Sequence, residues 1–133
     1  MDAHGIPLAL QLTAANVNDC QCFADRLEAL PALKRRGPGR PRRRPRKVHA
    51  DKGYDFRKCR EACRVRGIQH RIARRGMESK ERLGRHRWVV ERTFAWLNRQ
   101  RRLLVRFDRQ AALYEGFLTL GCALICWNVV KRF

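Results

Sequence analysis

Two acidic residues, Asp51 and Glu91, are candidates for chemistry because both lie in strongly basic surroundings. Asp51 is expected at the carboxyl end of a short strand, and Glu91 is expected inside an arginine-rich helix. Neighbouring cations stabilise carboxylates but do not require them, so the positions of both acids need an explanation. One explanation for Glu91 is an ordinary ion pair, since Arg87 precedes it by four residues on the expected helix. The spacing alone does not decide whether Glu91 forms a structural ion pair or is a functional acid.

The basic residues are concentrated in the middle of the chain. The 133 residues include 31 Lys and Arg and 12 Asp and Glu, a formal net charge of +19. Residues 34–109 hold 28 of these cations and 7 of the acids, a net +21, and the remaining residues sum to −2. Because 44% of the residues are hydrophobic, the chain can bury a core, which excludes a disordered basic tail. A folded domain with this charge indicates a nucleic-acid partner.

Segment 34–47 is expected to be an extended, solvated loop. It contains nine cations and three prolines, a composition that is incompatible with a helix or a central strand. Its Gly-Arg-Pro core at 39–41 resembles an AT-hook, which lies in a narrow minor groove, but the motif is short. Contact with phosphates without sequence preference is the simpler interpretation. Under both interpretations the candidate DNA-binding residues of this loop are Arg40, Arg42, Arg43 and Arg44.

The remaining pattern predicts a mixed α/β fold. A strand, a helix and a second strand follow one another at 47–50, 55–66 and 68–73, which is typical of a βαβ unit. Between the first two, Gly53 is expected in a turn, where a glycine permits a positive φ. The other expected elements are a strand at 5–13, a helix at 20–34, a long amphipathic helix at 85–105 with Val90, Phe94, Leu97 and Leu104 on its apolar face, and an apolar closing helix at 111–130.

Three features bear on location and redox state. The closing helix is interrupted by Glu115 and Asn128, which favours a buried core helix over a membrane span. The N-terminus lacks the basic and apolar regions of a secretory signal, which predicts an intracellular protein. The six cysteines lie in pairs without the two-residue spacing of a zinc knuckle. Buried free thiols are therefore favoured, and a metal site or disulfides are the alternatives.

Two longer motifs surround the candidate acids. They are HADKGYD at 49–55 and RWVVERTFAWLNRQRRLLVR at 87–106. They resemble the second-aspartate and glutamate regions of bacterial insertion-sequence transposases of the DDE type, and residues 2–19 are similar to the segment that precedes those regions. The resemblance covers almost the whole chain in the family's order. It implies a ribonuclease-H-like fold, a mixed sheet with flanking helices, in which Asp51 is the second acid and Glu91 is the third.

The resemblance also implies a chemistry, the Mg²⁺-dependent cleavage and transfer of DNA strands. Two Mg²⁺ ions, for which Mn²⁺ can substitute, would activate the attacking oxygen and neutralise the leaving one. Asp51 would bridge both ions and Glu91 would hold one. Arg87 would contact a phosphate or orient Glu91, and the DNA backbone would be held by Arg99, Arg101 and Arg102. The implied partners are transposon ends, target DNA and further copies of the chain on that DNA, in the bacterial cytoplasm at the nucleoid and without a membrane.

The sequence departs from the family pattern at three places. The signature Tyr-x2-Arg-x3-Glu-x6-Lys has Gly84 at its tyrosine and Asn98 at its lysine. The first aspartate is missing, and Asp2 is expected to be a turn residue that does not replace it. We therefore expect residues 1–133 to be the C-terminal part of a transposase catalytic domain, arising by truncation, internal initiation or a frameshifted gene. Such a part would lack its first strands, be marginally stable, and be inactive without the N-terminal part.

Two other classes of protein fit part of the pattern. A non-catalytic basic DNA-binding protein derived from a transposase would keep the basic surface without the chemistry, and its DNA binding would not depend on Asp51. A ribosomal or RNA-packaging protein accounts for the charge but not for the positions of Asp51 and Glu91.

Overall fold

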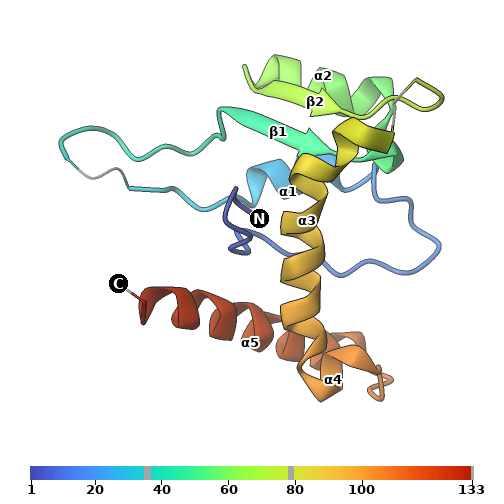
Figure 1. Cartoon of the computed structure of the whole chain (residues 1–133), viewed down its shortest axis with the longest axis vertical. Coiled ribbons are helices and arrows are strands. Elements are labelled where there is room, and N and C mark those ends of the chain that lie inside the picture. Colours follow the sequence, from blue (N-terminus) through green and yellow to red (C-terminus); the bar gives the residue numbers. More distant parts are fainter. Residues whose placement is uncertain (35–36, 78–79, 133) are drawn as a thin grey trace. The chain divides into compact units, whose positions relative to one another are not determined.

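The fold is described by a computed structural model, which covers residues 1–34, 37–77 and 80–132 and, within them, all side chains except those of 80–86. In chain order (Figure 1) the elements are α1 (Phe23–Glu28), β1 (Lys47–Ala50), the 3₁₀ helix η1 (Lys52–Tyr54), α2 (Arg57–Val65), β2 (Gln69–Ile72), α3 (Lys80–Asn98), α4 (Arg101–Leu104) and α5 (Ala111–Val130). The chain divides into two compact units. We call Thr13–Leu83 the sheet unit, and Met1–Leu12 with Gly84–Phe133 the helical unit. The mixed α/β class is therefore confirmed.

The sheet unit contains the expected βαβ arrangement. β1 and β2 form a two-stranded parallel sheet, in which Val48 lies opposite His70 and Ala50 lies opposite Ile72. α2 connects the two strands and ends just before Gly67, whose φ of 64° is a conformation that glycine adopts without strain. The pattern of the sequence thus located both strands and the helix between them.

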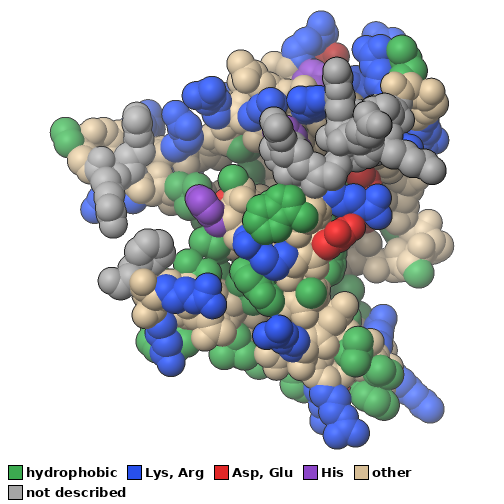
Figure 2. All heavy atoms as spheres, viewed as in Figure 1, with side chains coloured by type: hydrophobic (Ala, Val, Ile, Leu, Met, Phe, Trp, Pro, Cys, Tyr) green, Lys and Arg blue, Asp and Glu red, His purple; other side chains and the backbone are tan. Residues whose placement is uncertain are grey.

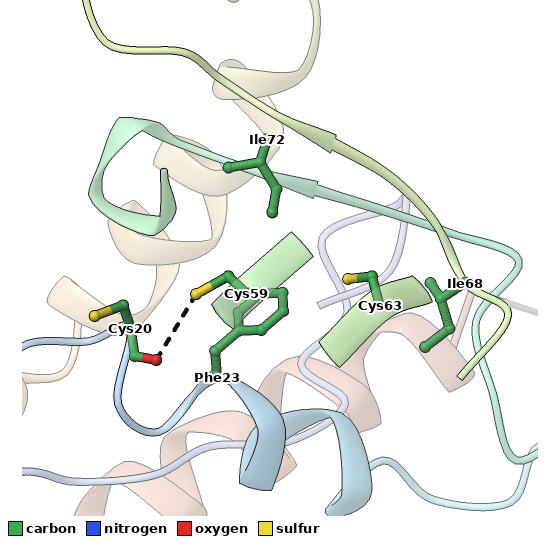
Figure 3. Packing of buried hydrophobic residues seen from close by; sticks show 6 residues of the cluster. All are labelled: Cys20, Phe23, Cys59, Cys63, Ile68 and Ile72. Atoms are coloured by element: carbon green, nitrogen blue, oxygen red, sulfur yellow. Dashed lines mark hydrogen bonds between the residues drawn. The ribbon is translucent and has the colours of Figure 1, made fainter. Parts of the chain in front are cut away.

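Cysteines form much of the core of the sheet unit. Figure 3 shows Cys59 of α2 between Ile72 of the sheet and Phe23 of α1, and Cys59 Sγ donates to the backbone oxygen of Cys20 at 3.7 Å. Burial raises the pKa of the Cys59 thiol and of the Cys63 thiol, so both stay protonated and pack as small apolar groups. The buried free thiols are Cys20, Cys59 and Cys63, and the half-buried ones are Cys22, Cys122 and Cys126.

The Pro- and Arg-rich segment between α1 and β1 is a loop, as expected. Its described residues up to Arg44 are exposed, and the residues at 35–36 lie outside the described part of the chain. The backbones of Leu33 and Arg42 exchange two hydrogen bonds of 2.9 Å in an isolated antiparallel bridge. This bridge closes residues 33–42 into a loop that is tied at its base.

Two expectations for the start of the chain are wrong. Residues 5–13 form no strand, because Pro7 has no N–H to donate and the described residues supply no partner strand. The helix expected at 20–34 is confined to the six residues of α1. Its early end agrees with Pro31, which disfavours helical backbone at the residue before it.

α3 buries a different face from the expected one. Val90 and Phe94 are exposed, whereas Val89, Thr93 and Leu97 are buried. These three positions are four residues apart and therefore share one face of the helix. The apolar pattern pointed to the neighbouring face because Thr93 is polar by type, although it is only 2% exposed.

Thr93 is buried because it binds the N-terminal segment of the chain. Its hydroxyl donates to the backbone oxygen of Gly5 at 2.7 Å. Gly5 is buried with a φ of 79°, and a Cβ there would lie 2.7 Å from Thr93 Oγ1, so only glycine fits. Nearby, Nη2 of Arg92 donates to the backbone oxygen of His4 at 2.6 Å. The first turn of the chain therefore packs directly on α3.

The single helix expected at 85–105 is divided into α3 and α4. The backbone is extended at Gln100, between the two helices. The division brings Leu103 into a small core with Leu97 and Ile125, whereas Leu104, expected on the apolar face, is exposed. A continuous helix would have placed Leu104 and Leu97 on one side, since they are seven residues apart.

α5 has the expected bounds but not the expected burial. Its buried residues are Gly121 and Ile125, and at Gly121 a Cβ would lie 2.8 Å from Leu103 Cδ1. The exposed large apolar side chains of α5 are Leu113, Leu120, Leu124, Trp127 and Val130. Among the described helices, α5 alone is long and apolar enough to cross a membrane, judged by length and composition only, with a mean hydropathy of 1.5. Burial is thus limited to the stripe that faces α3 and α4.

Replacing Thr93 by Val keeps the shape of the side chain and leaves the buried oxygen of Gly5 without its donor. We expect the free energy of unfolding to fall by about 1–3 kcal/mol, measured by urea denaturation. Thr119→Val is the matched control, because Thr119 donates to the oxygen of Glu115 at 2.8 Å but is exposed. The control should change stability by less than about 0.5 kcal/mol. If both variants lose the same free energy of unfolding, the hydrogen bond to Gly5 contributes no more to stability than the exposed one.

The exposed apolar face of α5 should make the isolated chain associate with itself and bind hydrophobic dyes. Replacing Leu120 and Leu124 together by Lys should lower dye fluorescence and light scattering without changing the helix content measured by circular dichroism. The control replaces Thr119 and Asn128, two exposed polar residues of the same helix, by Lys. If the control lowers scattering as much as the leucine variant, added charge and not apolar exposure is the cause.

Candidate functional site

Asp51 lies at the carboxyl end of β1, where the strand turns into η1. Its carboxylate caps η1, with Oδ1 accepting from the backbone N–H of Gly53 at 3.1 Å. Gly53 lies in the expected turn but does not adopt the positive φ that a glycine permits. The glycine avoids a close contact, because a Cβ at this position would lie 3.1 Å from Oδ1 of Asp51. The Asp51 carboxylate is therefore exposed and is held through one oxygen.

The other acid of this motif, Asp55, has a structural role. Its carboxylate accepts from the Arg60 guanidinium at 2.5 Å and from the backbone N–H of Arg75 at 2.9 Å. The hydrogen bond from Arg60, followed by that from Arg75, lowers the pKa of Asp55. Because Arg75 follows β2, these contacts join the segments that follow the two strands. In contrast, no ion pair forms at Asp51 among the described residues.

Glu91 pairs with Arg87 on an exposed face of α3. Arg87 Nε lies 2.8 Å from Glu91 Oε1, and the two side chains are 71% and 62% exposed. An exposed i, i+4 pair contributes only about 0.3–0.5 kcal/mol, so another ligand can readily replace Arg87. The ion pair that the spacing suggested is confirmed, and it does not bury the acid.

Beside Glu91 lies an aromatic sandwich that the sequence analysis did not identify. The guanidinium of Arg92 lies 4.5 Å from the ring centre of Trp88 and 4.8 Å from that of Trp96. Together with the hydrogen bond to His4, these cation–π contacts fix Arg92 in place. The Trp-x3-Arg-x3-Trp spacing was the available signal, because it puts all three side chains on one face of a helix.

Asp2 is a turn residue, as expected. Its Oδ1 accepts from the backbone N–H of His4 at 2.8 Å and from that of Ile6 at 2.9 Å. Its backbone oxygen accepts from the N–H of Gly5 at 3.2 Å. The carboxylate of Asp2 thus forms the turn that packs on α3.

The four candidate arginines of the basic loop lie together. They line a concavity of about 600 Å³ in the sheet unit together with two further arginines. Within the described part of the chain, the arginines of this lining are Arg40, Arg42, Arg43, Arg44, Arg46 and Arg66. Among the residues that the structure describes, no acid contributes to this lining. Figure 2 shows Lys and Arg side chains over all parts of the visible face, with Asp and Glu at few points. The arginine-lined concavity therefore suits an anionic ligand.

The candidate arginines of the helical unit differ from one another. Arg99 and Arg101 are exposed, and their side chains form no hydrogen bond or ion pair within the described part of the chain. Arg102 instead pairs with Asp108 at 3.3 Å and lies over the ring of Phe117 at 5.0 Å. Arg99 and Arg101 are therefore free to bind an external anion, whereas Arg102 also stabilises the fold.

The two candidate acids belong to different units, Asp51 to the sheet unit and Glu91 to the helical unit. Across residues 1–34, 37–77 and 80–132, no group of three or more His, Cys, Asp or Glu residues is arranged to hold a metal ion. Each unit by itself presents one of the two candidate acids, exposed and hydrogen-bonded through one of its oxygens. Carboxylates of this kind provide the hard oxygen ligands that Mg²⁺ prefers.

A folded mixed α/β chain with a net charge of +19 indicates a protein that binds nucleic acid. Residues 1–128 match the family model of the transposase DDE domain. The chain is 52% identical over 132 residues to a protein described as a transposase for insertion sequence element IS402 of Burkholderia cepacia. It is 26% identical over 144 residues to the transposase for insertion sequence element IS1106 of Neisseria meningitidis serogroup B. The chain therefore belongs to the DDE transposase family, as the resemblance indicated.

The matches cover most of this chain but only part of the relatives. Both matches cover 98% of this chain. The first covers 62% of the IS402 protein, and the second covers 44% of the IS1106 protein. No solved structure matches the chain significantly. The family relationship implies a ribonuclease-H-like fold, of which the two-stranded parallel sheet and its helices are too small a part to serve as confirmation.

The lowered pKa of Asp55 predicts a pH-dependent stability. The folded pKa lies below the ordinary value of 3.8, so the stabilisation is fully present above about pH 4 and is lost as the pH falls through the folded pKa. Asp55→Asn should therefore lower the urea midpoint at pH 6, and its difference from the parent chain should shrink towards pH 3. Asp25→Asn, which removes an exposed acid of α1, is the control for charge. A difference that stays constant from pH 6 to pH 3 would contradict the ionic role of Asp55.

Proposed function

We propose that this chain carries two of the three catalytic acids of a DDE transposase, Asp51 and Glu91, and takes part in cleavage and transfer of DNA strands. The observation that carries the proposal is the contrast between Asp51 and Asp55. Both follow β1 in one motif, yet Asp55 is neutralised by Arg60 and Arg75, whereas Asp51 is exposed and accepts one backbone hydrogen bond. Membership of the family supports the same assignment.

The donor atoms present fit Mg²⁺, with Mn²⁺ as a substitute. Both are hard cations that bind carboxylate oxygens, water and substrate phosphate. Asp51 and Glu91 would supply the carboxylate oxygens. When bound, such ions activate the attacking oxygen and neutralise the leaving oxygen of a phosphodiester. The third acid would come from another segment of the transposase, because the carboxylate of Asp2 is occupied in its turn.

The basic residues of the chain would bind and orient the DNA. Arg87 holds Glu91 in an exposed pair, so it can turn to a phosphate when Glu91 takes another ligand. Arg99 and Arg101, exposed after α3, would contact the phosphate backbone. The partners would be transposon ends, target DNA, the rest of the transposase and further copies of the chain on the DNA.

The proposal is tested by combining the chain with the separately produced remainder of the IS402 relative. The substrate is a duplex carrying the ends of the chain's own insertion sequence, in Mg²⁺. Asp51→Asn and Glu91→Gln should each lower strand cleavage by at least about 100-fold, because each removes a metal ligand. Binding of the same duplex in EDTA should not fall in either variant. Asp25→Asn serves as the control and should cleave normally.

A second measurement does not depend on turnover. Binding of Mn²⁺ to the chain on DNA, followed by water-proton relaxation, should weaken in both variants and not in the control. The catalytic assignment fails if Asp51→Asn retains both Mn²⁺ binding and cleavage. Cleavage by the 133-residue chain alone, abolished by the same two substitutions, would overturn the inference that a third acid is required from elsewhere. Metal-independent DNA binding without cleavage in any combination would favour a non-catalytic DNA-binding protein.

A further inference from the structure

The arginine-lined concavity of the sheet unit is a built feature and not a random gathering of loop side chains. The bridge between Leu33 and Arg42 ties the loop at its base. Nη1 of Arg44 donates to the backbone oxygen of Arg66 at 3.3 Å, which connects the loop to the end of α2. Arg66 in turn donates to the backbone oxygen of Ala62 and pairs with Glu28. Segments from three parts of the chain therefore converge on one concave surface.

The charge of this surface is poorly compensated. Of its six arginines, Arg66 alone forms an ion pair within the described part of the chain. The loop arginines Arg40, Arg42, Arg43 and Arg44 are exposed and have no acidic partner among the described residues. Cations brought this close together repel one another unless an anion lies between them. The surface is therefore arranged for a ligand with several negative charges.

The concavity and Asp51 lie at opposite ends of the same strand. The loop enters β1 at its amino end through Arg46, and Asp51 follows the carboxyl end of the strand. At about 3.3 Å per residue, the four residues of β1 separate the two ends by about 13 Å. That distance corresponds to about four base pairs of duplex DNA. An anion bound in the concavity would therefore differ from a phosphate bound at Asp51.

We propose that this concavity is an anchoring site for duplex DNA, which grips backbone phosphates several base pairs away from the bond processed at Asp51. The inference rests on the proposed function for the identity of the polyanion. Five of its six arginines come from one loop segment, which suits a row of phosphates. The Gly-Arg-Pro core is tied at Arg42 by the bridge and is not a free extended arm, so the geometry favours backbone contact over reading of a minor groove.

The test compares two variants of the full chain that each lose three positive charges. The first replaces Arg42, Arg43 and Arg44 by Gln, and the control replaces Arg109, Lys131 and Arg132 by Gln. The dissociation constant for a 20-base-pair duplex of arbitrary sequence is measured in EDTA at several salt concentrations. Each lost phosphate contact lowers the slope of log Kd against log salt concentration by about 0.9. We expect a decrease of about 2–3 for the loop variant and less than about 1 for the control.

A lysine variant and footprinting keep the result interpretable if the glutamine variant folds poorly. Replacing the same three arginines by Lys should retain the slope, since backbone contact depends on charge. Hydroxyl-radical footprints of the glutamine variant should lose one discrete protected segment and keep the remainder. Equal slopes in the loop and control variants would overturn the anchoring site. A preference for A·T-rich duplexes that the lysine variant loses would replace it with groove reading, and equal affinity for duplex RNA would overturn the assignment to DNA.

The test is independent of catalysis. Asp51→Asn should leave the salt slope unchanged in EDTA, because the anchoring site does not include that acid. A failed anchoring test therefore leaves the proposed catalytic role intact. A failed catalytic test together with a lowered slope in the loop variant would leave the anchoring site standing in a DNA-binding protein.

Discussion

The scarcity of acids is the constraint on which the structure depends. With 31 cations and 12 acids, each carboxylate has more than two potential partners. Most acids of the sheet unit whose side chains the structure describes accordingly form ion pairs with nearby arginines. Asp51 is an exception that lies at the end of a parallel strand. Asp25 and Glu115 are also exposed without an ion pair among the described residues, so exposure alone does not distinguish Asp51. Asp51 is distinguished by its place at the strand end, within a motif whose second acid, Asp55, is neutralised.

Local patterns predicted the elements whose stability is local. β1 and α5 have the expected bounds, and the βαβ order was apparent from alternating apolar residues and the glycine after α2. The strand expected at 5–13 failed because a strand is defined by its partner, which no local pattern supplies. The buried face of α3 was predicted wrongly because Thr93 is a polar residue. Its burial depends on the hydrogen bond from its hydroxyl to the backbone oxygen of Gly5, 88 residues away, which no local pattern indicates.

The candidate site was predictable to the level of residue identity but not of environment. The motifs pointed to Asp51, Glu91 and Arg87, and the Arg87–Glu91 pair followed from helical spacing. Sequence could not show the hydrogen bond from Arg75 to Asp55, because Arg75 reaches that carboxylate only once both strands are paired. Nor could it show that the loop arginines share a surface with Arg66, which depends on the bridge at Leu33 and on the end of α2.

The contact between the first turn and α3 has a consequence for the order of folding. The backbone oxygens of His4 and Gly5 accept hydrogen bonds from the side chains of Arg92 and Thr93, so this segment has no partner until the glutamate-bearing helix has been synthesised. Closing a loop of this length costs entropy before the contact stabilises anything, and such long-range contacts generally form late. The βαβ segment between them is short in sequence range and is free to form first. The helix that carries Glu91 would then be fixed in the last step of folding, after the strand that carries Asp51.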